Sequence, residues 1–276
     1  MDRRAPVLVT RAEFRFYGQL NDFLPATARQ ATVRRRLDGS PGVKDAIEAI
    51  GVPHPEVALI VANGEPVTFA YRVRNGDRIA VYPPLRSIDI STVTGMTSED
   101  PHAAQFVVDG HLGRLAAYLR MLGFDTVYDN RAGDADLAQT SVDEGRILLT
   151  RDRGLLKRGI VVRGYLVRAD RAPTQLVEVL ERFDLAAAAR PFRRCLRCNG
   201  ELQPADRRTV EAEVPPRVFA EQAEFRRCAG CNAIYWRGSH HRRMDRIVRA
   251  VLAQASASSS PMEVPGPELL EHASRV

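Results

Sequence analysis

Two short apolar runs in the middle of the chain flank a segment with helical apolar spacing. The first run covers residues 106–108 and the second covers residues 147–149. Between them, apolar side chains recur three or four positions apart, at Leu112, Leu115, Ala116, Leu119 and Leu122. The separation of the runs suits one strand-helix-strand crossover. The pattern therefore predicts an α/β domain with a central parallel sheet.

A different pattern precedes this region. Residues 7–16 alternate apolar and polar side chains, and residues 43–50 have helical spacing after the turn residues 39–42. Two more strand signals and two turn signals follow, at residues 57–61 and 79–82 and at Asn63-Gly64 and Asn75-Gly76-Asp77. Strands around one helix predict a small α+β domain, in which Asn63-Gly64 simply joins two strands.

Composition marks the boundaries between domains. A chain of 276 residues is expected to hold two or three domains. The Ser-, Thr- and Asp-rich stretch before residue 104 has no apolar periodicity and indicates a linker, and the composition after Leu252 predicts a mobile tail. The expected parts are an α+β domain (1–86), a linker (87–103), an α/β domain (104–190), a cysteine-bearing domain (191–245), and a helix end with a mobile tail (246–276).

Charge is unevenly spread along the chain, whose formal net charge is +6. Residues 190–250 hold fourteen arginines against seven acidic residues, whereas residues 104–189 are balanced. A basic patch suits phosphate backbones, although a general arginine bias of the genome would also explain it. No apolar run approaches the ~20 residues of a membrane span, and no secretion signal opens the chain, so we expect a cytoplasmic protein without a membrane partner.

All four cysteines fall into two Cys-x-x-Cys pairs, Cys195 with Cys198 and Cys228 with Cys231. Two such turns can present four thiolates to Zn²⁺, and a closed four-thiolate site is structural rather than catalytic. A redox dithiol is the alternative, but that chemistry generally uses a single Cys-x-x-Cys near a βαβ unit. The spacing therefore predicts a structural zinc ribbon.

Arginines and aromatic residues surround the two cysteine pairs. The arginines that we expect to contact RNA phosphates here are Arg193, Arg194, Arg197, Arg226 and Arg227. Exposed aromatic rings between such arginines can stack on unpaired bases. Trp236 itself is expected to pack in the small core of the ribbon, and His240 and His241 are expected at the surface.

Acidic residues follow the predicted strands. Asp109 closes the first strand, Asp152 follows the second, and Asp134 and Asp136 open a helical pattern between them. Active sites of open α/β sheets assemble at the carboxyl ends of the strands. Carboxylate oxygens suit Mg²⁺ or Mn²⁺, and such ions assist phosphodiester hydrolysis by activating water and stabilising the leaving oxygen. We therefore expect a nuclease site with Asp109, Asp134 and Asp152 as metal ligands.

Each of these acids also has a plain structural explanation. Aspartate is a favoured N-cap, so Asp109, Asp134 and Asp152 could each cap the helix that follows. Two acids at two strand ends favour the metal site over three separate caps. Arg151 and Arg153 are expected to hold the substrate phosphate, although solvated arginines beside a strand are common.

These motifs resemble those of a known family. Residues 106–116 read Phe-Val-Val-Asp-Gly-His-Leu-Gly-Arg-Leu-Ala, and residues 144–153 read Glu-Gly-Arg-Ile-Leu-Leu-Thr-Arg-Asp-Arg. With the cysteine pairs, they resemble the PIN-like RNase family named after the C-terminal domain of a nematode mutator exonuclease, Mut7-C. The resemblance implies a three-layer α/β/α PIN-like fold, Mg²⁺- or Mn²⁺-dependent RNA cleavage, and a zinc ribbon after the RNase domain. Relatives often have consecutive acids where this chain has Asp134-Ala135-Asp136, so either aspartate could bind the metal.

The N-terminal segment resembles the ubiquitin-like β-grasp domain found in front of some bacterial RNase-like proteins. Residues 40–57, 61–64 and 75–84 carry this resemblance, which extends more distantly to small sulfur carriers. Sulfur carriers need a free terminal Gly-Gly, whereas this chain continues through Pro83-Pro84-Leu85, so carrier chemistry is not expected. We expect the β-grasp domain to dock a protein partner or to position the substrate.

Three functions are compatible with these features. The first is an RNA-cleaving enzyme in which the ribbon assists RNA binding. The second is a noncatalytic RNA-binding or adaptor protein with a degenerate acidic pocket. A toxin-type PIN ribonuclease is the third, but such toxins are usually single small domains, and the flanking domains here argue against it.

Overall fold

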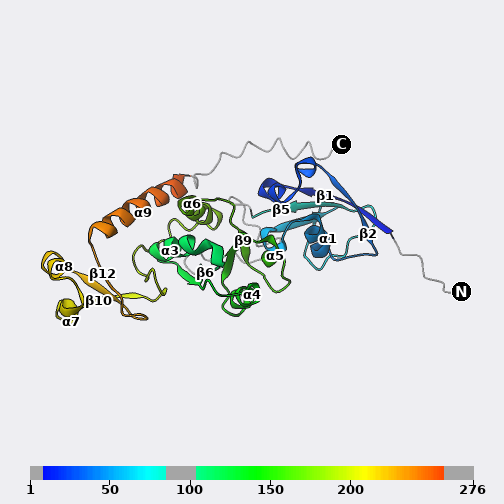
Figure 1. The fold of residues 1–276 in the computed structure, drawn as a ribbon. Helices are drawn as coiled ribbons and strands as arrows, with labels where there is room; N and C mark the ends of the chain where they lie inside the picture. Colours follow the sequence, from blue (N-terminus) through cyan, green and yellow to red (C-terminus); the bar gives the residue numbers. More distant parts are fainter. Residues whose placement is uncertain (1–8, 85–103, 258–276) are drawn as a thin grey trace.

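The computed structural model describes residues 9–84 and 104–257. They form an N-terminal sheet domain, a central α/β domain and a small cysteine-bearing domain, which follow one another along the molecule (Figure 1). The expected linker, residues 87–103, and the end of the expected tail lie outside the described residues. Within the described ranges, no helix combines the length and the apolar character that crossing a membrane requires.

The N-terminal domain is a five-stranded mixed sheet with one long helix. Its elements are β1 (Val9–Phe16), β2 (Val33–Asp38), α1 (Val43–Ile50), β3 (Leu59–Ala62), β4 (Glu65–Val67) and β5 (Arg78–Tyr82). The strand order is β2-β1-β5-β3-β4, with β1 parallel to β5 and the other pairs antiparallel. Phe14, Ile47 and Ile79 are buried in one core. The helix predicted for residues 43–50 and the Asn63-Gly64 turn between two strands are confirmed.

The central domain contains a four-stranded, fully parallel sheet in the order β7-β6-β8-β9. Its strands are β6 (Gln105–Val108), β7 (Asp125–Tyr128), β8 (Ile147–Thr150) and β9 (Gly164–Leu166). Its helices are α3 (Gly113–Met121), α4 (Asp134–Asp143), α5 (Arg153–Leu156) and α6 (Ala172–Arg182). Both strands predicted from the apolar runs are confirmed. Residues 160–162 form a further apolar run in the sequence, and they lie in the connection between α5 and β9 rather than in a strand.

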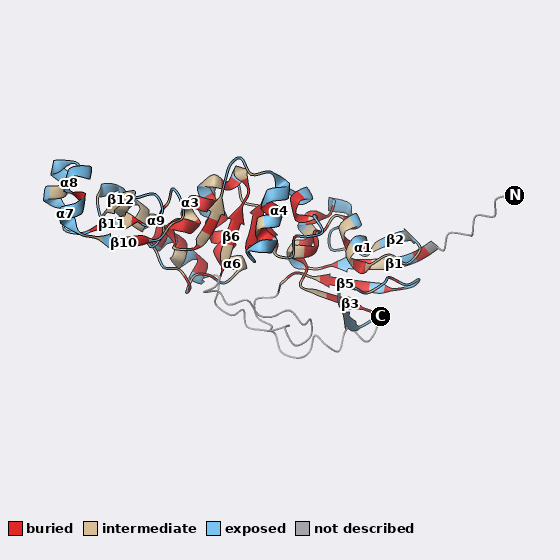
Figure 2. Ribbon diagram, turned by 90° about the horizontal axis from the view of Figure 1, so that it is seen from below, coloured by how far each residue is buried: buried red, intermediate tan, exposed pale blue. Residues whose placement is uncertain are grey.

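Alternate side chains of the central strands point into two separate cores. Phe106 and Leu149 pack in the cluster that contains residues of α3 and α6. Val107 and Leu148 pack instead with residues of α4 and α5. The strands are therefore buried on both faces (Figure 2). This arrangement is the three-layer α/β/α fold that the family resemblance implies.

Helix α9 (Ser239–Ala257) runs from the cysteine-bearing domain back along α6 (Figure 1). Val248, Val251 and Ala255 join the core formed by α3 and α6. The helix crosses the boundary expected at residue 245, and it continues beyond Leu252, where the composition suggested a tail. Burial of its apolar face explains the difference, because that face completes the outer helical layer.

The cysteine-bearing domain is built on the antiparallel sheet β10-β11-β12. Its elements are β10 (Leu202–Ala205), α7 (Arg207–Val210), α8 (Pro216–Glu221), β11 (Phe225–Cys228) and β12 (Ile234–Trp236). Val210, Val214 and Phe225 form a small core, and Trp236 packs against it. The expectation that Trp236 belongs to the ribbon core is confirmed.

Candidate functional site

Asp109 and Asp152 follow neighbouring parallel strands and are joined through a buried hydroxyl group. The Thr150 hydroxyl donates to Asp109 Oδ2 at 2.6 Å and accepts from the backbone N–H of Asp152 at 2.9 Å. Thr150 is fully buried, and Asp109 is only 9% exposed. Thr150 has no role among the sequence-based predictions, yet a hydroxyl at the end of an otherwise apolar strand is the signal that points to it.

Both carboxylates also cap the helices that follow them. Asp109 Oδ1 accepts from the N–H of His111 at 3.4 Å, and Asp152 Oδ1 accepts from the N–H of Gly154 at 2.6 Å. The structure thus shows the N-cap role that was the alternative explanation for Asp109 and Asp152. Capping does not use up the binding capacity of a carboxylate, because each oxygen has two lone pairs.

The two acids at the start of α4 have different surroundings. Asp136 Oδ2 accepts from the N–H of Gly133, the N-cap residue, at 3.2 Å. Asp134 does not act as the cap. Its carboxylate is half exposed, and Arg158 Nη2 lies 4.0 Å away. Asp134 is therefore the freer of the two acids.

The acids at this edge of the sheet lie farther apart than the ligands of a compact metal site. Among the described residues, only one group of three or more His, Cys, Asp or Glu has its ligand atoms within 4.8 Å of one another, and that group is the four cysteines. Asp109 and Asp152 stand at the carboxyl ends of β6 and β8, and Asp134 opens the helix after β7. The three-aspartate metal site stays a prediction.

The arginines expected at the acidic edge have protein partners. Arg151 pairs with Asp170 at 2.8 Å. Arg153 donates to the backbone carbonyls of Asp22 and Phe23, both at 3.3 Å, and its guanidinium lies 5.2 Å from the centroid of the Phe23 ring. Arg153 therefore connects the acidic edge to the N-terminal domain.

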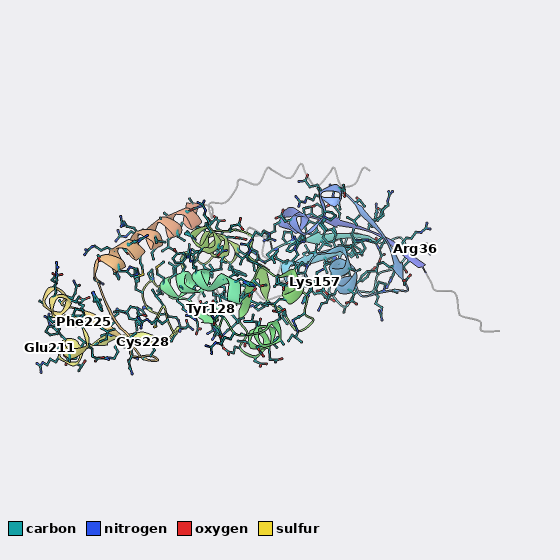
Figure 3. All side chains as sticks on the ribbon, in the orientation of Figure 1. Arg36, Tyr128, Lys157, Glu211, Phe225 and Cys228 are labelled. Carbon is teal, nitrogen blue, oxygen red and sulfur yellow. The ribbon has the colours of Figure 1, made fainter. Side chains whose placement is uncertain are left out.

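The N-terminal domain packs against the same side of the central domain. The Glu56 carboxylate is fully buried, accepts from the N–H of Leu166 at 2.7 Å and lies 3.6 Å from Arg168. Burial raises the pKa of Glu56, although the charge of Arg168 opposes this shift. Lys157, at the boundary in Figure 3, donates to the Glu48 carbonyl at 2.8 Å. Charged groups of both domains thus hold the contact together.

The cysteine-bearing domain docks on the opposite, amino-terminal edge of the sheet. Asp125 opens β7 beside the start of β6, and it accepts hydrogen bonds from Arg146 at 2.7 Å and from Asn199 at 2.8 Å. Arg194 lies 3.2 Å from the same carboxylate. Burial raises the pKa of Asp125, but these hydrogen bonds and positive charges outweigh burial and hold the pKa below its usual value. Arg194 thus stabilises the contact between the cysteine-bearing domain and the central sheet.

The other ribbon arginines divide into paired and exposed groups. Arg227 pairs with Glu213 at 2.7 Å, and it also donates to the Thr209 carbonyl. Arg193, Arg197 and Arg226 are exposed. The described structure therefore leaves these three arginines more accessible to an anionic partner than Arg194 and Arg227.

The four cysteines form a compact group that fits a zinc ion. Their Sγ atoms all lie within 4.8 Å of one another, with separations of 3.6 Å for Cys195–Cys231 and 3.3 Å for Cys198–Cys228. Zn–S bonds of about 2.3 Å in a tetrahedron require thiolates ~3.8 Å apart. A Cβ atom at Gly200 would lie 2.9 Å from the Sγ of Cys228, so the space around the sulfurs requires glycine there.

Local hydrogen bonds favour the thiolate form of the first cysteine. Burial raises the pKa of Cys195, but the hydroxyl of Tyr235 and the backbone N–H groups of Cys198 and Arg197 lower the pKa to about 6. Burial holds the pKa of Cys228 above its usual value. A bound Zn²⁺ deprotonates such a thiol outright. The donor set therefore suits a closed structural zinc site.

Matches to family models agree with this architecture. A family model described as the Mut7-C RNase domain matches residues 104–248, and one described as Mut7-C ubiquitin matches residues 9–89. Among solved structures, the chain is similar to SAMP1 from Haloferax volcanii, with 22% identity and a TM-score of 0.22 over 29% of this chain and 100% of that chain. No curated protein matches the chain. Because the RNase-domain model covers more than half of the sequence, the chain belongs to the Mut7-C RNase domain family.

Proposed function

We propose that the protein is a Mg²⁺- or Mn²⁺-dependent ribonuclease that hydrolyses RNA phosphodiester bonds at the carboxyl edge of the central sheet. The observation that carries this proposal is the pair Asp109 and Asp152, which follow neighbouring parallel strands and share the buried hydroxyl of Thr150. The match to an RNase-domain family supports a nuclease or RNA-related function.

Asp109, Asp134 and Asp152 would hold the catalytic ion, with Asp136 as the neighbouring acid. Their oxygens are the hard donors that Mg²⁺ and Mn²⁺ prefer. These ions commonly retain several waters, which suits acids whose oxygens are not packed together. When bound, such an ion lowers the pKa of the attacking water and stabilises the leaving oxygen.

The chain's own residues orient this site. Thr150 fixes the Asp109 carboxylate, and the exposed guanidinium of Arg158 near Asp134 offers a contact for a phosphate. The N-terminal domain lies against the same edge through Arg153, so it would position the substrate, and as a ubiquitin-like domain it would also offer a surface to a protein partner. The four cysteines would hold a structural Zn²⁺ that shapes an RNA-binding ribbon.

A noncatalytic RNA-binding or adaptor protein is the second candidate. The wide spacing of the acids and the capping bonds of Asp109 and Asp152 favour it. In that case the acidic edge would be a structural remnant, and the exposed ribbon arginines would carry the RNA contact.

A metal titration separates the two candidates. We expect end-labelled single-stranded RNA to be cleaved when Mg²⁺ or Mn²⁺ is added to protein freed of loosely bound ions, and not before. Passing buffers over a chelating resin, rather than adding a strong chelator, keeps the ribbon zinc in place. RNA binding without cleavage at any Mg²⁺ or Mn²⁺ concentration would support the adaptor, and undiminished cleavage without added ions would contradict the metal-dependent mechanism.

Replacement of Thr150 with valine tests the positioning of Asp109. The change keeps the side-chain shape but removes both hydrogen bonds of the hydroxyl, so we expect cleavage to fall about 10–100-fold, as for lost partners of metal ligands. Thr126→Val is the matched control, since Thr126 is equally buried and donates to the Phe124 carbonyl. The measurement is the cleavage rate at saturating metal, together with thermal unfolding. An equal loss of activity in both variants would indicate a general effect on folding instead.

A further inference from the structure

A groove of about 450 Å³ lies between the cysteine-bearing domain and α9, which we call the ribbon–α9 groove. The residues that matter for its chemistry are Phe192, Arg193, Arg226, Trp236, His241 and Arg249. They come from the segment before the first cysteine pair, from β11 and β12, and from α9. The groove therefore exists only because α9 turns back along the central domain.

Aromatic rings supply flat apolar surfaces along this groove. Phe192 and His241 have ring centroids 4.3 Å apart with an interplanar angle of 36°. The backbone of Phe192 is held in the left-handed region at φ 61°, and its N–H donates to the Met121 carbonyl at 2.9 Å. His241, expected at the surface, is half-buried here, and burial lowers its pKa, which favours the neutral ring. Such fixed rings suit stacking on planar groups.

The charge of the groove is predominantly positive. Five arginines and two acidic residues line it. Asp245 pairs with Arg249 at 2.9 Å, and Glu224 lies 4.0 Å from Arg237. Arg193 and Arg226 remain exposed to solvent. Planar apolar surfaces beside exposed guanidinium groups match a ligand that combines flat rings with repeated negative charges.

The groove and the acidic edge lie at opposite ends of the central sheet. The first cysteine turn docks beside Asp125, the first residue of β7, whereas the hydroxyl of Tyr128, the last residue of β7, donates to the Gly110 carbonyl next to Asp109. A four-residue strand spans about 10 Å. A ligand in the groove is therefore separated from the acids by at least the length of the sheet.

We propose that the ribbon–α9 groove binds an unpaired segment of the RNA substrate away from the bond that is cut. Bases stack on the Phe192–His241 pair and beside Trp236, while Arg193 and Arg226 contact phosphates. Paired bases in a duplex are not available for such stacking. The identity of the ligand as substrate rests on the proposed ribonuclease function.

Trp236 makes the groove directly observable, because it is the single tryptophan of the chain. We expect titration of the full-length protein with a single-stranded oligonucleotide, without added Mg²⁺ or Mn²⁺, to change the tryptophan fluorescence saturably. A duplex RNA of the same length should change it little. Fluorescence anisotropy of labelled RNA, recorded in parallel, gives the total affinity.

Charge variants test the phosphate contacts. The double variant Arg193→Ala/Arg226→Ala should reduce the dependence of log affinity on log salt by about 2, because each phosphate contact contributes about one unit. The matched control is Arg208→Ala/Arg217→Ala, which removes two exposed arginines on α7 and α8, outside the groove. It should leave the salt dependence and the fluorescence change intact.

Four results would overturn the proposal. The first is RNA binding, seen by anisotropy, without a change in tryptophan fluorescence, and the second is an equal fluorescence change with duplex RNA. The third is an equal fluorescence change with polyglutamate, which would indicate an acidic protein partner. The fourth is an equal loss of RNA affinity in the two double variants. Cleavage by a protein whose tryptophan does not respond contradicts only the groove. A tryptophan response in a protein that never cleaves contradicts only the ribonuclease and supports the groove.

Discussion

Replacement of Asp109 with asparagine is expected to lower RNA cleavage by about 10²–10³-fold. Asp109 closes the central strand β6, is almost fully buried, and is oriented by Thr150. An amide in its place keeps the shape and a hydrogen-bond acceptor but loses the negative charge that attracts a divalent ion. Metal ions stabilise such transition states by several kcal/mol, and each ~1.4 kcal/mol corresponds to a factor of ten in rate. The measurement is the cleavage rate of labelled RNA at saturating Mg²⁺ or Mn²⁺.

The control for this variant is Asp143→Asn, which makes the same change in charge at the exposed carboxyl end of α4. We expect Asp143→Asn to cleave at the original rate and both variants to bind RNA as before. If Asp109→Asn cleaves as fast as the original protein, the acidic edge of the sheet is not the site of hydrolysis. Loss of RNA binding together with cleavage would instead point to a damaged fold.

Replacement of Cys228 with serine is expected to unfold the cysteine-bearing domain. Cys228 is fully buried at the end of β11, and its sulfur lies within 3.3 Å of the sulfur of Cys198. In small zinc domains, metal binding supplies an apparent ~10–16 kcal/mol of folding free energy, far more than the small core around Phe225 can replace. The bound zinc should fall from one ion per chain to none. Hydrogen exchange should accelerate in β10–β12 and remain slow in β6 and β8.

Arg217→Ala provides the control, because it changes an exposed position of the same domain, on α8. It should retain one zinc ion per chain and slow exchange in β11. If the Cys228→Ser protein keeps slow exchange in β10–β12 without zinc, the ribbon is stabilised by its own packing rather than by a metal. Asn199, which lies between the first cysteine pair and Asp125, should lose its contact with β7 when the ribbon unfolds.

Local patterns predict the elements of this fold well. The runs that became β6 and β8 are continuous and apolar because both faces of these strands are covered by helices. The helix at residues 43–50 is predicted by its apolar spacing and by the glycines that flank it. The grouping of the four cysteines is equally predictable, since two Cys-x-x-Cys turns leave few structural alternatives.

Contacts between distant residues are much harder to derive from the sequence. Nothing local indicates that Arg194 neutralises Asp125, or that Arg153 reaches the carbonyls of residues 22 and 23. These pairs depend on how the domains pack, which is decided by three-dimensional shape. For the same reason, the sequence predicts a cysteine-bearing domain and a cluster of acids, but it does not predict that this domain docks at the edge of the sheet opposite Asp109 and Asp152. In α9, the apolar side chains Val248, Val251 and Ala255 recur at helical spacing on one face. The polar residues at the start of this helix make the pattern harder to recognise.

Glu56 has a consequence for solubility. The central sheet ends at β9, and the N–H of Leu166 in this strand points away from β8 towards the Glu56 carboxylate. An uncovered outer strand can recruit a strand from another molecule and start aggregation. By occupying that amide with the Glu56 side chain, the ubiquitin-like domain covers this outer strand, and we expect that cover to hinder self-association.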